Sequence, residues 1–230
     1  GAITIGTSGG NITGSTGVLT GASYTFNNTN DATVSSVLAG ASALTQAGVG
    51  TTTLSGLNTY SGGTNIGAGT LKAGSAIALG SGAVGVASGA SLDLNGQAMT
   101  STGVLTLNGT GIGSGGALKN SSATGATFAG LVALGADSSV VGETGAIALS
   151  NVGSITGASY NLTLGGAQGG SVASIIGTTT GALVKEGVGT WTLNGANTYS
   201  GGTTVNAGTL TAGNNSAFGN NTSALTINGG

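Results

Sequence analysis

The chain has 230 residues, of which 50 are Gly and none is Pro, Cys or His. Three Lys and five acidic residues are the only charged side chains, and the formal net charge is −2. So few cations argue against nucleic acid as a partner, because phosphate neutralisation needs several clustered Lys or Arg residues. The abundance of Val, Ile, Leu and Thr argues against a disordered linker.

The sequence shows no membrane-spanning helix and no disulfide framework. The stretch between Glu143 and Lys185 is uncharged, but Gly, Ser, Thr and Asn interrupt its apolar runs before the roughly 18 residues that a helix needs. We therefore expect no transmembrane segment. The absence of Cys fits either a reducing compartment or an exported chain that must stay free of disulfide bonds during transit.

Short apolar and polar residues alternate with period two. In chain order, the clearest alternating runs are Ser91–Leu94, Val104–Leu107, Leu162–Leu164 and Ala224–Ile227. Each run places Leu or Ile on one side and polar residues on the other, as in a half-buried strand. A Gly pair or an Asn-Gly pair closes each run and predicts a tight turn with positive φ. No window keeps a helical period without an interrupting Gly, so the sequence predicts an all-β fold.

The chain contains an internal duplication. Residues 43–80 align without gaps to residues 182–219, with 24 identities in 38 positions and an offset of 139 residues. The likeness continues more loosely upstream, which gives two repeat units at about 24–80 and 160–219. No linker or change of composition separates them, so a solenoid explains the duplication better than two separate domains.

We expect residues 1–230 to form one continuous β-solenoid segment. With roughly 20 to 25 residues in each coil, the chain gives about ten coils. At about 4.8 Å for each coil, the rod would be on the order of 50 Å long. The many glycines are expected mainly at the corners, where each coil turns sharply.

The two copies carry a distinctive motif. GVGTTTLSGLNTYSGGTNIGAGTLKAG at 48–74 and GVGTWTLNGANTYSGGTTVNAGTLTAG at 187–213 strongly resemble the transport-associated repeats of autotransporter passenger domains. This resemblance implies a right-handed parallel β-helix, located outside the cell or on the outer surface of a Gram-negative bacterium. It also implies a separate C-terminal β-barrel anchor. No segment here resembles such a barrel, so we expect a fragment or a mature product.

The repeated Asn-Thr-Tyr-Ser-Gly-Gly block is interpreted as scaffold rather than as a ligand site. Its glycines are expected to turn a corner, and its tyrosines to pack against a neighbouring coil rather than stack on sugar. These residues are Gly62, Gly63, Gly201 and Gly202, and Tyr60 and Tyr199. Trp191 replaces Thr52 of the first copy and is expected to fill the core or the end of a coil.

Two short motifs resemble catalytic or nucleotide-binding signatures. A G-x-S-x-G pattern occupies Gly6–Gly10, but a chain without His cannot form a Ser-His-Asp triad. A G-x-G-x-x-G pattern occupies Gly111–Gly116, but no helix follows to receive a pyrophosphate. Both motifs are attributed to turns in a glycine-rich chain.

The carboxylates and metal ligands are also sparse. Asp137 and Glu143 are the only two carboxylates that lie close together in the sequence. Isolated, solvated charges explain them better than the catalytic carboxylate pair of a glycosidase does. Without Cys, His or a calcium-binding repeat, no metal site and no cofactor are expected. The sequence therefore predicts that the protein is not an enzyme.

Three functions remain open from the sequence. The first is an extracellular stalk, adhesin or matrix scaffold, whose partners would be a host or neighbouring-cell surface or a polysaccharide. The second is a filament or sheath subunit that associates with other copies by end-to-end stacking of coils, since open strand edges favour association. A carbohydrate-active β-helix is the least favoured.

Overall fold

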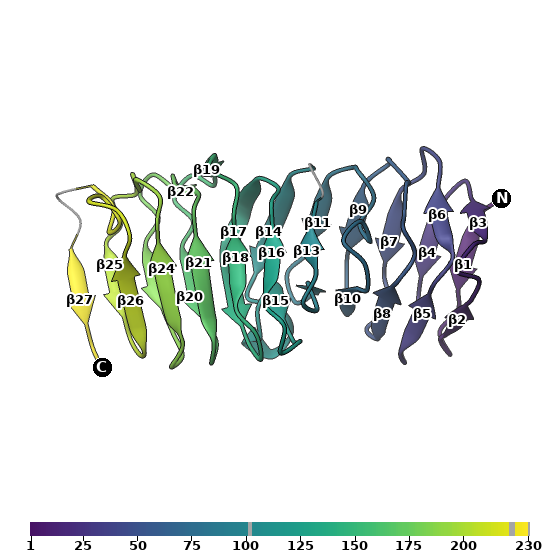
Figure 1. The fold of residues 1–230 in the computed structure, drawn as a ribbon, viewed down its shortest axis with the longest axis horizontal. Coiled ribbons are helices and arrows are strands. Elements are labelled where there is room, and N and C mark those ends of the chain that lie inside the picture. The colour runs from purple at the N-terminus through teal and green to yellow at the C-terminus, as the bar shows by residue number, and fades with distance from the viewer. Residues whose placement is uncertain (101–102, 221–223, 230) are drawn as a thin grey trace.

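The computed structural model describes residues 1–100, 103–220 and 224–229. Within them the chain is an all-β solenoid of about ten stacked coils, and every strand pairing is parallel. Figure 1 shows the coils stacked side by side along a rod, with the two ends of the chain at opposite ends of the rod. The expected fold class and the expected number of coils are confirmed.

Each coil contributes short strands to three faces of the rod. Face A begins with β1 (Ile3–Ile5), β4 (Tyr24–Phe26), β7 (Leu44–Gln46), β9 (Thr64–Ile66), β11 (Val84–Val86) and β14 (Leu105–Gly109). It continues through the start of β17 (Val132–Gly142), β19 (Ser154–Ile155) and β22 (Ile175–Ile176).

Face B forms the longest ladder of paired strands. Its first part contains β2 (Gly10–Ile12), β5 (Ala32–Val34), β8 (Thr51–Leu54), β10 (Thr70–Ala73), β12 (Ser91–Asp93) and β15 (Leu118–Asn120). The end of β17 follows, and then β20 (Leu162–Gly165), β23 (Leu183–Lys185), β25 (Thr203–Val205) and β27 (Leu225–Ile227).

Face C holds two groups of strands. The first group is β3 (Val18–Thr20) and β6 (Val37–Ala39). The second is β13 (Ala98–Met99), β16 (Ala126–Phe128), β18 (Ile147–Leu149), β21 (Gly169–Val172), β24 (Thr190–Leu193) and β26 (Thr209–Ala212). Backbone hydrogen bonds through Tyr60 and Ala76 link the two groups.

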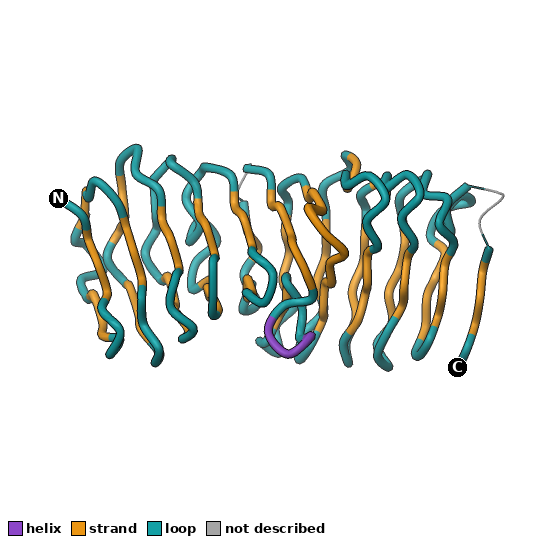
Figure 2. Tube along the Cα trace, turned by 180° about the vertical axis from the view of Figure 1, so that it is seen from behind, coloured by secondary structure: helices purple, strands orange, loops and turns teal. Residues whose placement is uncertain are grey.

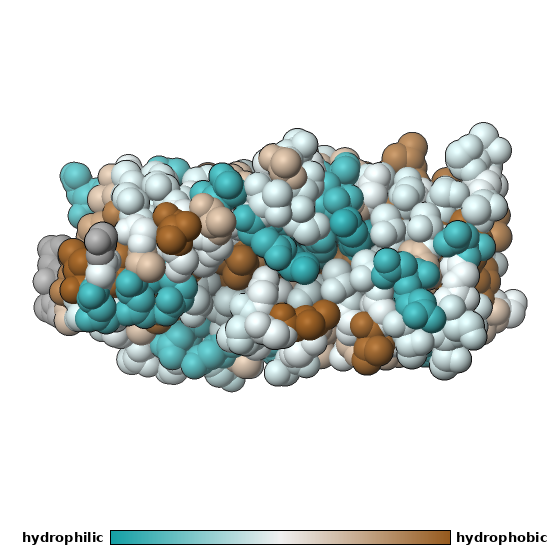
Figure 3. All heavy atoms as spheres, turned by 90° about the horizontal axis from the view of Figure 1, so that it is seen from below, coloured by the Kyte–Doolittle hydropathy of each residue, from teal (hydrophilic) through white to brown (hydrophobic). Residues whose placement is uncertain are grey.

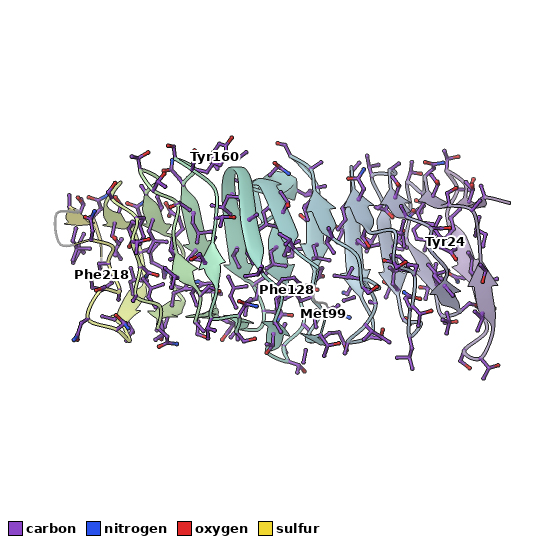
Figure 4. All side chains as sticks on the ribbon, turned by 90° about the horizontal axis from the view of Figure 1, so that it is seen from above. Tyr24, Met99, Phe128, Tyr160 and Phe218 are labelled. Atoms are coloured by element: carbon purple, nitrogen blue, oxygen red, sulfur yellow. The ribbon has the colours of Figure 1, made fainter. Side chains whose placement is uncertain are left out.

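The alternation seen in the sequence produces the core. Inward positions stack in register from coil to coil, as in the row of Ile66, Val86 and Leu107 on face A, all fully buried. Because parallel coils repeat, each apolar side chain lies above a similar one, which removes a continuous apolar column from water. Figure 4 labels Met99 and Phe128, which are register partners from successive coils on face C.

One coil departs from the regular spacing. Register partners Leu92 and Leu118 are 26 residues apart, whereas Leu71 and Leu92 are 21 apart. The extra residues form a loop between β14 and β15 that contains a single 3-10 turn, Ile112–Ser114. This turn is the purple segment at the lower edge of the rod in Figure 2.

Glycine lies at corners, as expected, but also inside strands. Positive φ angles occur at the expected closures Asn95-Gly96 (48° and 73°), Gly109 (90°) and Gly166 (103°), whereas Gly229 is not among the positive-φ residues. Gly85 and Gly170 lie within β11 and β21. At Gly170 a Cβ atom would lie 2.0 Å from the carbonyl oxygen of Ile147, so close approach of neighbouring coils, and not only turning, requires glycine there.

Candidate functional site

The Asn of the repeated block connects three successive coils. The Oδ1 atom of Asn58 accepts a hydrogen bond from the backbone N–H of Leu38 (2.9 Å), and its Nδ2 donates to the carbonyl of Ala78 (2.7 Å). In the second copy, Asn197 makes the same two bonds, to Ile176 and Ala217, at 2.8 and 2.6 Å. Its amide therefore satisfies backbone groups in the coils before and after its own.

The repeated tyrosines point into the core and are fully buried. The Tyr60 hydroxyl lies 2.6 Å from Thr64 Oγ1, and the Tyr199 hydroxyl lies 2.6 Å from Thr203 Oγ1. Burial raises the pKa of Tyr60 above its ordinary value and raises that of Tyr199 to about 12. A ring without exposed surface cannot stack on a sugar, so this geometry favours the packing role.

The four block glycines meet two different constraints. Gly63 and Gly202 both have φ of 89°, a conformation that L side chains rarely adopt. At Gly62 and Gly201 the neighbouring coil is too close, because an added Cβ would lie 2.4 Å from a backbone atom in each case. The block therefore requires two consecutive glycines at each corner.

The two copies of the block lie on different faces of the rod. Six complete coils separate β7 from β22, and both of these strands lie on face A. In the second copy, the strand that corresponds to β7 is β23, which follows β22 and lies on face B. The 139-residue offset is therefore not a whole number of coils. Equivalent corners point in different directions about the axis, so the two copies do not form one continuous ligand-binding face.

The copies differ most at two inward positions. Gln46 of the first copy corresponds to Lys185 of the second, and both side chains are fully buried. The Nζ atom of Lys185 donates to the carbonyls of Glu186, Gly187 and Ala207 at 2.8, 2.6 and 2.9 Å. Burial lowers the pKa of Lys185, and the nearby Glu186 partly opposes that shift. Three carbonyls thus match the three donors of an ammonium group.

Trp191 occupies the other divergent position and lies in the core. It is fully buried, and its indole N–H donates to the carbonyl of Gly165 at 3.0 Å. Its register partner in the preceding coil is Gly170. Thr52, at the same position of the first copy, instead donates from Oγ1 to the buried Asn28 at 3.0 Å.

The short motifs lie in turns. In the Gly6–Gly10 segment, the N–H of Gly9 bonds back to the carbonyl of Gly6, and Gly9 and Gly10 have positive φ. Gly111, Gly113 and Gly116 belong to the loop around the 3-10 turn, and all three have positive φ. Neither segment precedes an α-helix, so neither has the structural context of a nucleophile elbow or a dinucleotide site.

The two carboxylates considered for catalysis have separate partners. Asp137 accepts hydrogen bonds from the backbone N–H and the Nδ2 of Asn161, and Glu143 lies 3.8 Å from the ammonium of Lys119. Within residues 1–100, 103–220 and 224–229, no three potential metal-ligating side chains of the His, Cys, Asp or Glu type gather into a group. The same part of the chain contains no helix with the length and hydrophobicity needed to cross a bilayer.

Comparison with known proteins identifies the repeats. The passenger-associated-transport-repeat family matches residues 44–73 and 183–212, which run from β7 to the end of β10 and from β23 to the end of β26. Searches among curated proteins and solved structures found no match. The chain therefore contains two passenger-associated transport repeats in a β-solenoid, consistent with an autotransporter passenger domain. Such repeats imply a secreted or surface-exposed protein of a Gram-negative bacterium.

Proposed function

We propose that this chain is a rigid stalk or adhesin segment of a passenger domain, displayed outside the cell. The observation that carries the proposal is the structural use of the repeat. Asn58 and Tyr60, with their equivalents Asn197 and Tyr199, are buried and bonded to their own or neighbouring coils. The repeats therefore supply length and stiffness.

Surface display of the chain tests this function. The chain would be fused between a signal peptide and a β-barrel translocator in a Gram-negative laboratory host, and adhesion of the cells to surfaces and to other cells would be measured. We expect a protease-resistant passenger and stronger adhesion than with the translocator alone. A matched variant, Gly62→Ala with Gly201→Ala, would lose both properties because its corners cannot close. Equal adhesion with and without the passenger would refute the adhesive role.

Stacking of copies is a second candidate, because the chain carries only three Lys and five acidic residues and so has few charges that would keep strand edges of neighbouring copies apart. Electron microscopy of the purified chain distinguishes the two functions. Long fibres would support a filament subunit, and single rods on the order of 50 Å long would support the stalk.

A further inference from the structure

The surface of the rod carries few reactive side chains. The chain has no Cys and no His, and Figure 3 shows one face of the rod, on which hydrophobic side chains are scattered singly rather than gathered into an apolar patch. Asn is a thermolabile side chain, and it reacts with its own backbone most readily when Gly follows, because Gly has no side chain to hinder the approach. The sequence contains four such pairs, which are Asn95-Gly96, Asn108-Gly109, Asn194-Gly195 and Asn228-Gly229.

The Asn95-Gly96 pair is held by hydrogen bonds at both of the groups that would react. The Nδ2 atom of Asn95 donates to the carbonyl of Ala73 at 2.9 Å. The N–H of Gly96 donates to Oδ1 of Asn120, also at 2.9 Å. Both bonds must break before the side chain and the backbone of this pair can meet.

The side chains of Asn108 and Asn228 are held as well. The Nδ2 atom of Asn108 donates to the carbonyl of Val86 at 2.8 Å. The Nδ2 atom of Asn228 donates to Oδ1 of Asn206 at 2.7 Å. Stacking of the coils therefore restrains the side-chain amide in three of the four pairs.

The remaining pair, Asn194-Gly195, has no such restraint. Within residues 1–100, 103–220 and 224–229, neither the Asn194 side chain nor the N–H of Gly195 makes a hydrogen bond. Asn194 is exposed and directly follows β24. Its own backbone N–H donates to the carbonyl of Val172 at 2.8 Å. The pair thus has a defined place in the coil while its two reacting groups are free.

These two free groups are the ones that deamidation joins. After losing its proton, the nitrogen of Gly195 attacks Cγ of Asn194. A new C–N bond closes a five-membered succinimide ring, and the bond from Cγ to Nδ2 breaks to release ammonia. Water then opens the ring at either carbonyl and gives aspartate or isoaspartate. Overall, one amide and one water become one carboxylate and one ammonium ion.

The first copy of the repeat lacks this chemistry. Ser55 and Gly56 occupy the positions of Asn194 and Gly195, and a hydroxyl cannot form the ring. Ser55 is exposed, as Asn194 is, so Ser is a natural replacement at this corner. The reaction is therefore confined to the second copy.

The isoaspartate product would disturb the stacking of coils, because its backbone contains an additional carbon atom. Gly195 lies so close to the carbonyl of Ser174 in the preceding coil that an added Cβ atom would not fit. Two residues later, Asn197 bridges the N–H of Ile176 and the carbonyl of Ala217. A longer backbone at position 194 would shift this bridge relative to both neighbouring coils.

We propose that Asn194 is a modification site at which spontaneous deamidation gives aspartate and isoaspartate, and that the isoaspartate form weakens the second repeat. The proposal concerns the ageing of the chain and does not depend on what the chain adheres to. The new carboxylate changes the formal net charge from −2 to −3.

Incubation of the full chain in warm, mildly alkaline buffer tests the proposal. Peptide mapping by mass spectrometry locates each deamidated residue, and an isoaspartyl methyltransferase measures the isoaspartate formed. In the folded chain, Asn194 should deamidate about tenfold or more faster than Asn95, because two hydrogen bonds must break before Asn95 reacts. In concentrated urea the two rates should become similar, because the hydrogen bonds of the folded chain are gone.

Asn194→Ser reproduces the first copy and is the matched control. This variant should form no isoaspartate at position 194, and its urea midpoint should stay the same after incubation. The midpoint of the wild type should fall as isoaspartate accumulates. Asn194→Asp carries the new charge without the longer backbone, and it should unfold close to the fresh wild type.

Two results would overturn the proposal. Deamidation of Asn194 no faster than that of Asn95 in the folded chain would remove the assignment of the site. An unchanged urea midpoint in chains that contain isoaspartate at position 194 would remove its effect on the second repeat.

Discussion

Replacement of Asn58 by Ala tests how the repeats hold the rod together. The Asn58 amide satisfies the N–H of Leu38 and the carbonyl of Ala78, which lie in the coils on either side. The substitution leaves both groups buried without a partner. Each unsatisfied group costs about 1–3 kcal/mol, so the loss of unfolding free energy for the two groups should be roughly 2–6 kcal/mol.

The assay is urea unfolding followed by far-UV circular dichroism, combined with hydrogen exchange at the Leu38 amide. Asn65→Ala is the control, because Asn65 is exposed on face A of the same copy. Its effect should stay within about 0.5 kcal/mol. A stability of Asn58→Ala equal to that of Asn65→Ala, with Leu38 still protected, would refute the bridging role.

Four further predictions concern a corner glycine, two titratable groups of the core and the indole. Gly62→Ala should prevent folding or lower the thermal midpoint strongly, whereas Gly6→Ala, with nothing within 4 Å of an added Cβ, should not. The pKa of Tyr199 is raised to about 12, so its contribution to stability is present below pH 10 and is lost as the pH rises toward 12. In urea unfolding at a series of pH values, Tyr199→Phe should remove this decrease in the free energy of unfolding. The pKa of Lys185 is lowered from 10.5, so this group alone makes stability rise with pH up to about 10.5, and Lys185→Gln should abolish that rise. Trp191→Thr should cost roughly 3–5 kcal/mol in urea unfolding because it leaves a cavity, and an unchanged midpoint would contradict the buried position.

The strands could be predicted from the sequence because alternation is a local property. The alternating runs Ser91–Leu94 and Leu162–Leu164 correspond to strands Ser91–Asp93 and Leu162–Gly165. The solenoid followed from the duplication, which needs a fold that repeats along one axis. The tight turns followed mostly from the Gly and Asn-Gly closures.

The rotation between the two copies could not be predicted from the same signals. Which face a strand joins depends on the summed length of all preceding coils, and the Ile112–Ser114 loop adds residues without adding a face. The alignment shows that two segments are equivalent. It does not show that β7 and β23 lie on different faces.

The roles of individual polar residues were also hidden. Lys185 and Asp93 resemble the solvated charges of a soluble rod in the sequence, yet both are buried. Lys185 is held by three backbone carbonyls, and Asp93 by donors that include Ser121 of the next coil. Partners of this kind come from the stacking of coils. The recurrence of Asn58 as Asn197 was the one signal that could have indicated a bridging amide.

Antibody labelling of the bacterium that encodes this chain tests the central claim most directly. Antibodies raised against the folded solenoid would be applied to intact cells and, in parallel, to permeabilised cells. The account predicts labelling of intact cells, or of protein released into the medium, at a level that permeabilisation does not increase. Labelling that appears only after permeabilisation would place the solenoid inside the cell and contradict its function as an exported passenger.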